Sequence, residues 1–290
     1  MEREIRMPEA MDTPNKLEAL TTGPPHQHLC HLTTDILKTE RTDMFMLYSH
    51  PVENLACNVV YFAKLTFPDK TNRQILAART AKSRFDFLAL EHQRLGKLID
   101  YGDVIRLYGK ILDEMFFFGS LLEPRNERVV IEYVDIYYED LNKPVFGYSL
   151  VNFVGACSKI VIYRADNQRV WRRNRLEMTV ITILHEMVHV FLATFSCPAC
   201  LPAWEGEGRS GHGKAFMDIM SVLPAAAVQN GIIPKWTLEM LDLEFDLGKE
   251  LDASGSPMPD DETLRRWGLD RKVVEITQEL RRKQLQLYQP

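Results

Sequence analysis

Cysteine is scarce in this 290-residue chain, and its use does not indicate a disulfide framework. The count is odd, and the positions are scattered: Cys30, Cys57, Cys157, Cys197 and Cys200. The chain also lacks an uncharged stretch long enough to span a membrane, and its first residues contain no apolar segment of the signal-peptide type. We therefore expect reduced thiols and an intracellular protein, in the nucleus or the cytoplasm, with no membrane partner.

Basic residues are not in excess. Lys and Arg number 35 against 40 Asp and Glu, so the formal net charge is -5. The charge of the whole chain therefore does not indicate binding to nucleic acid, and such binding would require a local basic patch. Hydrophobic residues make up 46% of the chain, which is enough for a globular fold with a substantial core.

The composition and the spacing of apolar residues change along the chain and divide it into four segments. Residues 1–30 are polar and proline-bearing, and they predict a disordered tail. Residues 31–102 have helical spacing and predict a helical N-terminal extension. We expect the core domain at residues 103–225, where helical and strand patterns both occur, and a C-terminal extension at residues 226–290.

Helical spacing is clearest at two places outside the predicted core domain. After Pro51, apolar residues recur every three or four positions and predict one buried face. These residues are Val52, Leu55, Val59 and Ala63. Near the other end of the chain, a stretch of mixed charge from about Thr263 to Leu287 predicts a single terminal helix.

Three short stretches within the core domain are rich in Val, Ile and Tyr. They read RVVIEYVDIYY, VFGYSLVNF and ACSKIVIYR, and turn residues separate them, so each predicts a strand. A long helix follows, which Asn174 can cap and which is apolar almost all round. The fold class we expect is therefore α+β, with a small, mainly antiparallel three-stranded sheet packed on this helix.

The predicted buried helix contains polar residues in the stretch TILHEMVHVF. His185 and His189 are four positions apart, so on a helix they project from one face and can share one metal ion. Burying two imidazoles is costly unless their nitrogens are satisfied, and metal ligation satisfies them. Glu186 stands where a general base stands in the pattern H-E-x-x-H, in which it takes a proton from metal-bound water.

A catalytic zinc ion usually takes three protein ligands and keeps one position for water. Leu192 and Phe195 stand where the metzincin pattern requires glycine and histidine, so that class is excluded. Glu205, Glu207 and His212 remain as candidates for the third ligand. His212 falls at a predicted helix start, which holds a ligand more firmly than a glycine-rich loop does.

The segments HEMVHVF and GHGKAF together resemble the SprT-like zinc metalloprotease family, and the resemblance covers about residues 103–225. It implies a zincin-like core in which His185, His189 and His212 bind one Zn²⁺ and Glu186 is the general base. It also implies cleavage of proteins attached to DNA. The spacing between the second and third ligands is longer here than in the family, and the C-terminal four-cysteine zinc ribbon of many members is missing.

Two further groups are candidate sites. Cys197 and Cys200 form one CxxC pair, which could hold a second metal or undergo redox chemistry, or could simply be loop thiols. Four arginines precede the metal-binding helix and are candidates for DNA contact, although such a cluster also fits a solvated turn. They are Arg169, Arg172, Arg173 and Arg175.

The sequence thus predicts a zinc endopeptidase with a protein or peptide substrate. We expect the substrate chain to lie along an edge strand, and Tyr148 or Tyr163 is a candidate oxyanion donor. Two alternatives stay open. One is a non-catalytic, zinc-stabilised scaffold or nucleic-acid-associated binding module, and the other is an intracellular metallopeptidase unrelated to DNA. An intact Glu186 favours catalysis, because a structural zinc site does not need that carboxylate.

Overall fold

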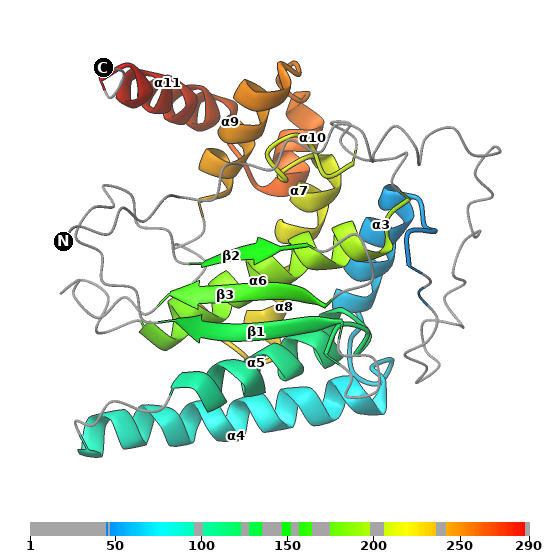
Figure 1. Cartoon of the computed structure of the whole chain (residues 1–290). Coiled ribbons are helices and arrows are strands. Elements are labelled where there is room, and N and C mark those ends of the chain that lie inside the picture. Colours follow the sequence, from blue (N-terminus) through cyan, green and yellow to red (C-terminus); the bar gives the residue numbers. More distant parts are fainter. Residues whose placement is uncertain are drawn as a thin grey trace, which may run out of the picture.

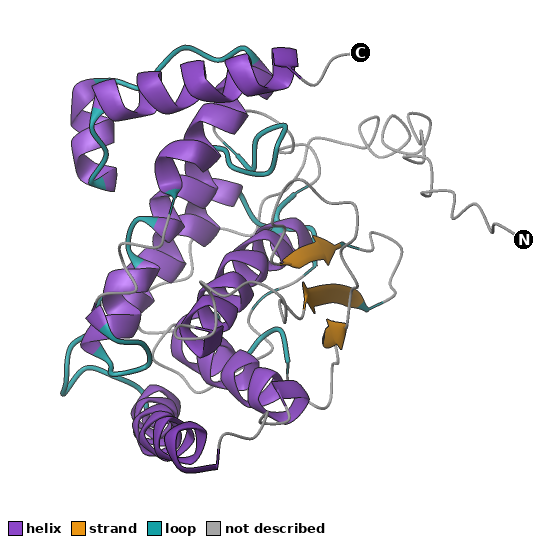
Figure 2. Cartoon of the chain, turned by 90° about the vertical axis from the view of Figure 1, so that its left-hand side faces the viewer, coloured by secondary structure: helices purple, strands orange, loops and turns teal. Residues whose placement is uncertain are grey.

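The fold is α+β, and helices gather on one face of a small sheet (Figures 1 and 2). The computed structural model of the chain describes residues 45, 47–95, 101–122, 128–134, 147–151, 157–163, 175–197, 206–235 and 242–287. The elements are α3 (Val52–Ala63), α4 (Asn72–Leu95), α5 (Tyr101–Phe116), β1 (Val129–Val134), β2 (Gly147–Leu150), β3 (Ser158–Tyr163), α6 (Arg175–Phe195), α7 (Lys214–Met220), α8 (Leu223–Gln229), α9 (Leu243–Ser254), α10 (Asp261–Trp267) and α11 (Arg271–Leu287). The predicted tail at residues 1–30 lies outside the described residues.

The three predicted strands are confirmed, and they form a sheet in the order β1-β3-β2. β2 pairs with β3 in antiparallel fashion, from Gly147 opposite Ile162, whereas β1 pairs with β3 in parallel, from Val129 opposite Ser158. The expectation of a mainly antiparallel sheet is therefore wrong, because the longer of the two pairings is parallel. The reason is topological: the chain passes from β1 to the far edge of the sheet, and β3 then returns between the two earlier strands.

Helix α6 occupies the centre of the molecule. Its Ile183, Val188 and Phe191 are fully buried, and the helix contacts β2, β3, α3, α5 and α7. It is long and apolar enough to cross a membrane by composition, but 83% of that stretch is buried inside the fold, which is what the core helix of a globular protein shows. The polar residues of TILHEMVHVF therefore lie on a helix that is mostly buried in the core.

The N-terminal helices complete the same core. The predicted inward face of α3 is confirmed, because Val52, Leu55, Val59 and Ala63 are all buried, and α3 packs against α6 and α7. Helix α4 begins at a capping box: the Gln74 amide donates to the Thr71 hydroxyl, and the Thr71 amide donates to the Gln74 side chain. Helix α4 then packs along α5 (Figure 1).

The C-terminal region differs from the single terminal helix that the charge pattern predicts. α10 ends at Gly268, whose φ of 74° is left-handed, and α11 begins as a separate helix. Helix α11 packs on α9, where Asp252 accepts hydrogen bonds from Gln278, Arg281 and Arg282. This pair of helices lies beyond β2 (Figure 1), and α9 contacts α7, so the C-terminal region reaches the site described below.

Candidate metal centre

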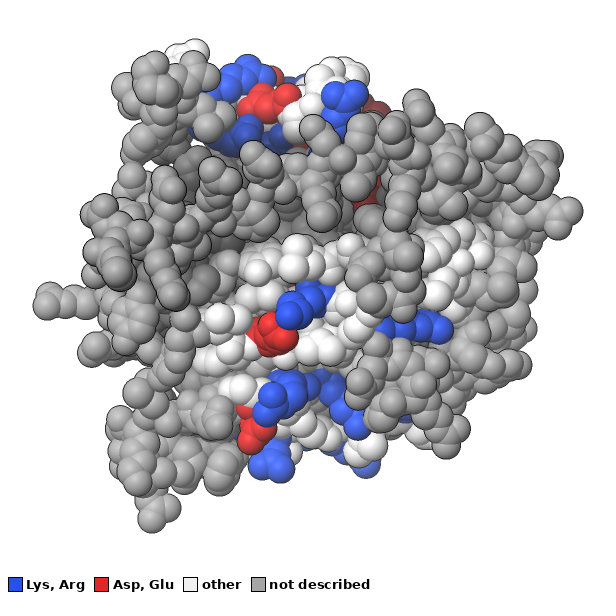
Figure 3. All heavy atoms as spheres, viewed as in Figure 1, with Lys and Arg blue, Asp and Glu red and all other residues white. Residues whose placement is uncertain are grey.

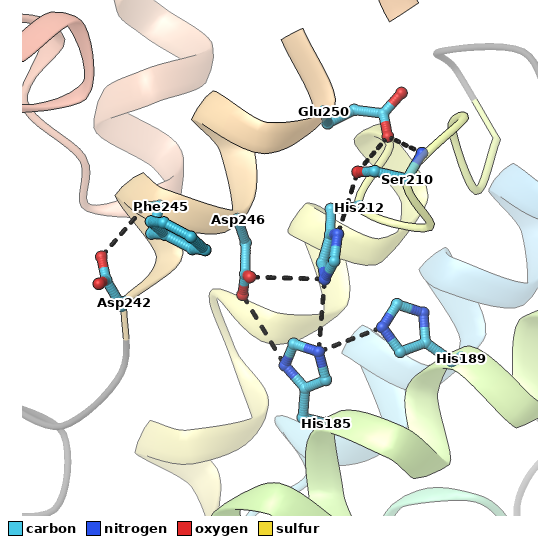
Figure 4. A network of polar contacts seen from close by, with 8 residues as sticks. All are labelled: His185, His189, Ser210, His212, Asp242, Phe245, Asp246 and Glu250. Carbon is cyan, nitrogen blue, oxygen red and sulfur yellow. Dashed lines mark hydrogen bonds and ion pairs between the residues drawn. The ribbon is translucent and has the colours of Figure 1, made fainter. Parts of the chain in front are cut away.

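Three imidazoles from two elements converge in the core. His185 and His189 lie one turn apart on α6, and His212 lies just before α7. The Nε2 atom of His185 is 3.1 Å from Nε2 of His189 and 3.4 Å from Nε2 of His212 (Figure 4). The donor atoms of all three residues lie within 4.8 Å of one another, and the sequence-predicted trio is thus brought together.

Packing fixes the orientation of the three rings. Phe216, from α7, is fully buried and contacts each imidazole, with ring centroids 5.0 Å from His185, 4.6 Å from His189 and 4.8 Å from His212. Gly211 has a φ of 85°, and a Cβ atom there would lie 3.0 Å from the His189 ring. A glycine before His212 therefore lets the loop approach α6 closely enough for the third imidazole to reach the other two.

Burial keeps the three imidazoles neutral. Desolvation lowers the pKa of His185 to about 4 and that of His212 to about 2, and it also holds the pKa of His189 well below the usual value for histidine. At neutral pH each ring therefore offers a lone pair. Protons compete little for these nitrogens, which is what a metal ligand requires.

A buried carboxylate fixes the tautomer of His212. The Ser210 hydroxyl donates to Oε2 of Glu250 at 2.7 Å, so the only hydroxyl proton is used there. The hydroxyl oxygen of Ser210 lies 3.1 Å from Nδ1 of His212, and because its own proton is directed to Glu250, it must accept the Nδ1 proton. Nε2 of His212 is consequently unprotonated and faces the other two imidazoles. A carboxylate that acts on a histidine in this way is the usual outer support of a metal ligand.

The donor set fits a zinc ion. Three Nε2 atoms face one another in a partly buried space, and hydrogen bonds among neutral imidazoles alone would leave at least one lone pair unsatisfied. For zinc bonds of about 2.0–2.1 Å in a tetrahedral site, neighbouring donors lie ~3.3 Å apart. The separations of 3.1 and 3.4 Å agree with that geometry. His185, His189 and His212 are therefore the residues that could hold a metal ion here.

Glu186 lies beside this group and faces the sheet. Its side chain is buried between α6 and β2, where Ser149 provides its hydrogen-bond partners. Burial raises the pKa of the Glu186 carboxyl to about 7, and the hydrogen bonds from Ser149 act in the opposite direction. A carboxyl whose pKa lies near neutrality can both accept and release a proton, as general acid and base catalysis requires.

Among the described residues, none of the remaining sequence candidates joins the converging group. Glu207 is not part of the converging group; its Oε1 is buried without a hydrogen-bond partner, and burial raises its pKa to about 8. Glu205 lies outside the described residues. Tyr148 and Tyr163 contact each other, with ring centroids 5.6 Å apart. By strand alternation Tyr148 projects from the face opposite Ser149, away from Glu186.

Neither the CxxC pair nor the arginine cluster can be placed in full. Cys197 is a buried free thiol at the end of α6, whereas Cys200 lies outside the described residues. Arg169, Arg172 and Arg173 also lie outside them, and Arg175 is the first residue of α6. On the face seen in Figure 3, basic side chains lie over the α4 and α5 region together with acidic ones.

Three functional candidates escape the sequence reasoning: Ser210, Asp246 and Glu250. Asp246 and Glu250 lie one turn apart on α9 and point toward the loop and the imidazoles (Figure 4). Glu250 is fully buried, and Asp246 lies with its carboxylate 3.4 Å from His212. The sequence signal for these residues is the four-residue spacing of Asp246 and Glu250, together with the buried leucines Leu247 and Leu251 on either side of Glu250. An acidic residue on a buried face needs a hydrogen-bond partner.

Comparisons of the chain with family models, with curated proteins and with solved structures find no match.

Proposed function

We propose that this protein is a zinc-dependent endopeptidase of the SprT-like type. The observation that carries the proposal is the convergence of three neutral imidazole nitrogens beside the carboxyl of Glu186. Two histidines and a glutamate on one helix, with a third histidine from a following element, form the ligand and base set of a metallopeptidase. A purely structural zinc site would not require Glu186.

The residues of the site have separate roles in the proposed hydrolysis of a peptide bond. His185, His189 and His212 would hold the ion, which when bound lowers the pKa of a water molecule toward 7 and polarises a carbonyl group. Glu186 accepts the proton of the attacking water and delivers it to the leaving amine. Ser149 positions that carboxyl from the neighbouring strand.

Strand β2 is the part of the fold best suited to hold a peptide substrate. It forms one edge of the described sheet, pairing with β3 alone, and its Ser149 contacts Glu186. An extended peptide added along this edge would gain main-chain hydrogen bonds and pass close to the base. Such binding depends little on side-chain identity, which supports proteins in general as the substrate class.

The resemblance of the HEMVHVF and GHGKAF segments extends the proposal to proteins crosslinked to DNA, acting in the nucleus or the cytoplasm. The arginines at positions 169, 172, 173 and 175 are the proposed contacts with the DNA backbone. A metallopeptidase unrelated to DNA and a zinc-stabilised scaffold are the competing proposals, and the experiment below separates all three.

The test compares wild type, Glu186→Gln and the control Glu53→Gln, which changes an exposed acid on α3. Each protein is assayed for bound zinc and for cleavage of an unfolded protein, with and without single-stranded DNA. We expect equal zinc in all three, and cleavage reduced by about 10²–10⁴-fold in Glu186→Gln alone. Stimulation by DNA supports the DNA-directed form. Zinc binding without any cleavage would favour the scaffold instead.

A further inference from the structure

Helix α9 carries a lysine on the side that it turns toward the histidines. Asp246, in the first turn of α9, points at the imidazoles, and its Oδ1 atom is 3.4 Å from Nε2 of His212 (Figure 4). Lys249 is three residues further along, so it projects from the same side of the helix after a rise of ~4.5 Å. The four-carbon stem of a lysine can span that rise. The ammonium of Lys249 can therefore reach the space beside the imidazoles.

The charge of Lys249 acts on groups from both helices that face the centre. Burial raises the pKa of the Glu186 carboxyl, on α6, and that of the Asp246 carboxyl, on α9, and the Lys249 ammonium opposes the rise at both. Electrostatic effects weaken with distance, so a cation that acts on both carboxyl groups lies near the space between them. Glu186 is the proposed general base, and Lys249 is therefore close to the position of the reaction.

The acidic side chains of α9 do not neutralise this lysine, because they have other partners. Asp246 contacts the histidines, Glu250 accepts from the loop that carries His212, and Asp252 pairs with arginines of α11. In the described part of the chain, no salt bridge joins Lys249 to a carboxylate. Lys249 is also half-buried, which strengthens its interaction with a nearby charge. Its ammonium is therefore available to an anion that forms at the centre.

Peptide hydrolysis produces such an anion. The water oxygen bonds to the carbonyl carbon, the π electron pair moves to the carbonyl oxygen, and Glu186 takes the water proton. When the C–N bond breaks, the carbonyl re-forms, the leaving amine takes the proton from Glu186, and the new acid releases its remaining proton to solvent. A fixed positive charge beside the oxyanion lowers the barrier. Tyr148, a sequence candidate for this role, projects away from Glu186, and Tyr163 contacts Tyr148.

We propose that Lys249 stabilises the oxyanion of peptide hydrolysis, so that α9 completes the active site from the side opposite α6. This inference rests on the proposed function and adds a catalytic residue to it. Lys249 belongs to residues 226–290, which the sequence predicts as an extension beyond the core domain. The catalytic unit therefore includes part of that extension, and α9 is attached to it through the hydrogen bonds of Glu250 with the Arg209 and Ser210 amides.

The test compares wild type, Lys249→Met, Lys249→Arg and the control Lys64→Met, which changes an exposed lysine at the end of α3. The readouts are kcat and KM for a peptide substrate, the Kd of a phosphonate peptide, and the Kd of zinc. A phosphonate carries the charge and the tetrahedral shape of the intermediate, so its binding reports on the oxyanion position without turnover.

Methionine keeps the length of the side chain and removes its charge. We expect kcat to fall by about 10²–10³-fold in Lys249→Met while KM changes little, because the charge acts on the transition state. The phosphonate peptide should bind at least ~10-fold more weakly. Lys249→Arg keeps the charge and should recover part of both losses. Zinc affinity should be equal in all four proteins, and Lys64→Met should match wild type throughout.

Three results would overturn this inference while the proposed function stands. The first is a Lys249→Met variant with the kcat and the phosphonate affinity of wild type. The second is a higher KM with unchanged kcat, which would make Lys249 a binding residue for the substrate. The third is weakened zinc binding in Lys249→Met, which would assign Lys249 to the structure of the site. If wild type cleaves no peptide at all, the proposed function itself fails.

Discussion

Two buried carboxyl groups hold two loops in this protein, and they do so over very different distances in sequence. Asp113, on α5, accepts hydrogen bonds from the amides of Leu121 and Leu122, in the turn that follows its own helix. Glu250, on α9, accepts from the amides of Arg209 and Ser210, about 40 residues earlier in the chain. Both side chains are buried, with relative exposures of 2% and 0%.

The difference lies in what each loop carries. The turn held by Asp113 contains none of the converging histidines, so that carboxyl group serves the fold. The loop held by Glu250 carries His212, and the Ser210 hydroxyl links the Glu250 carboxylate to that imidazole. The same kind of contact therefore stabilises structure in one place and orients a proposed metal ligand in the other, and variants can separate the two roles.

The largest expected effect is on the pH dependence of stability, at Asp113. Burial raises the pKa of Asp113 from 3.8 to about 8, so between these values the folded protein keeps a proton that the unfolded chain has lost. The free energy of unfolding therefore falls as pH rises through this window, by about 1.4 kcal/mol per pH unit. Asp113→Asn removes this contribution, because the amide is neutral at every pH.

Denaturant unfolding of wild type and Asp113→Asn at several pH values checks this prediction. Between pH 6 and pH 8, the variant should gain roughly 2–3 kcal/mol relative to wild type. The buried groups of the metal centre titrate in both proteins, so their contributions cancel when the free energies of unfolding are subtracted. A difference that stays constant with pH would show that Asp113 is ionised in the folded state.

The second prediction concerns zinc affinity and uses Glu250→Gln. The amide keeps the size of the side chain but cannot accept from every loop donor, and the orientation of His212 through Ser210 is weakened. We expect zinc to bind about 10–100-fold more weakly, as measured by competition with a chelator. Asp113→Asn is the matched control and should bind zinc as wild type does. Equal affinities in all three proteins would remove the distinction between the two carboxylates.

The smallest effect is expected at Gly208, in the loop that Glu250 holds. A Cβ atom there would lie 2.4 Å from the Glu250 carboxylate carbon, and the φ of Gly208 is 80°. Gly255 is the control, because its φ is 67° but nothing lies within 4 Å of the added atom. Both alanine variants should lose about 1–2 kcal/mol through backbone strain. Only Gly208→Ala should also weaken zinc binding, by about tenfold; equal zinc affinities would mean that the Glu250 contact has no effect on His212.

The sequence predicted the features that depend on short-range spacing. His185, Glu186 and His189 follow from one helical turn, and the buried face of α3 follows from apolar periodicity. The three strands were predictable from their branched and aromatic residues. Predicting His212 as the third ligand depended on two further signals, a helix start and the resemblance of the GHGKAF segment. The structure places His212 with the other two histidines.

Features that depend on long-range packing were not predictable. The parallel pairing of β1 with β3 depends on the edge of the sheet at which the chain places β2 after leaving β1, and no local residue pattern predicts that choice. Asp246 and Glu250 reach the centre only because α9 packs beside α7. Gly268 is a local signal of the break between α10 and α11, but a single glycine within a helical pattern is often tolerated and does not by itself predict the end of a helix.

The central claim is that three imidazoles from α6 and the loop before α7 bind one zinc ion. X-ray absorption at the zinc edge, combined with the zinc content of wild type and His212→Ala, tests it most directly. The account predicts one zinc per chain in wild type, with histidine nitrogens as ligands, and strongly reduced zinc in His212→Ala. Wild type without zinc, or His212→Ala with undiminished zinc, would contradict it.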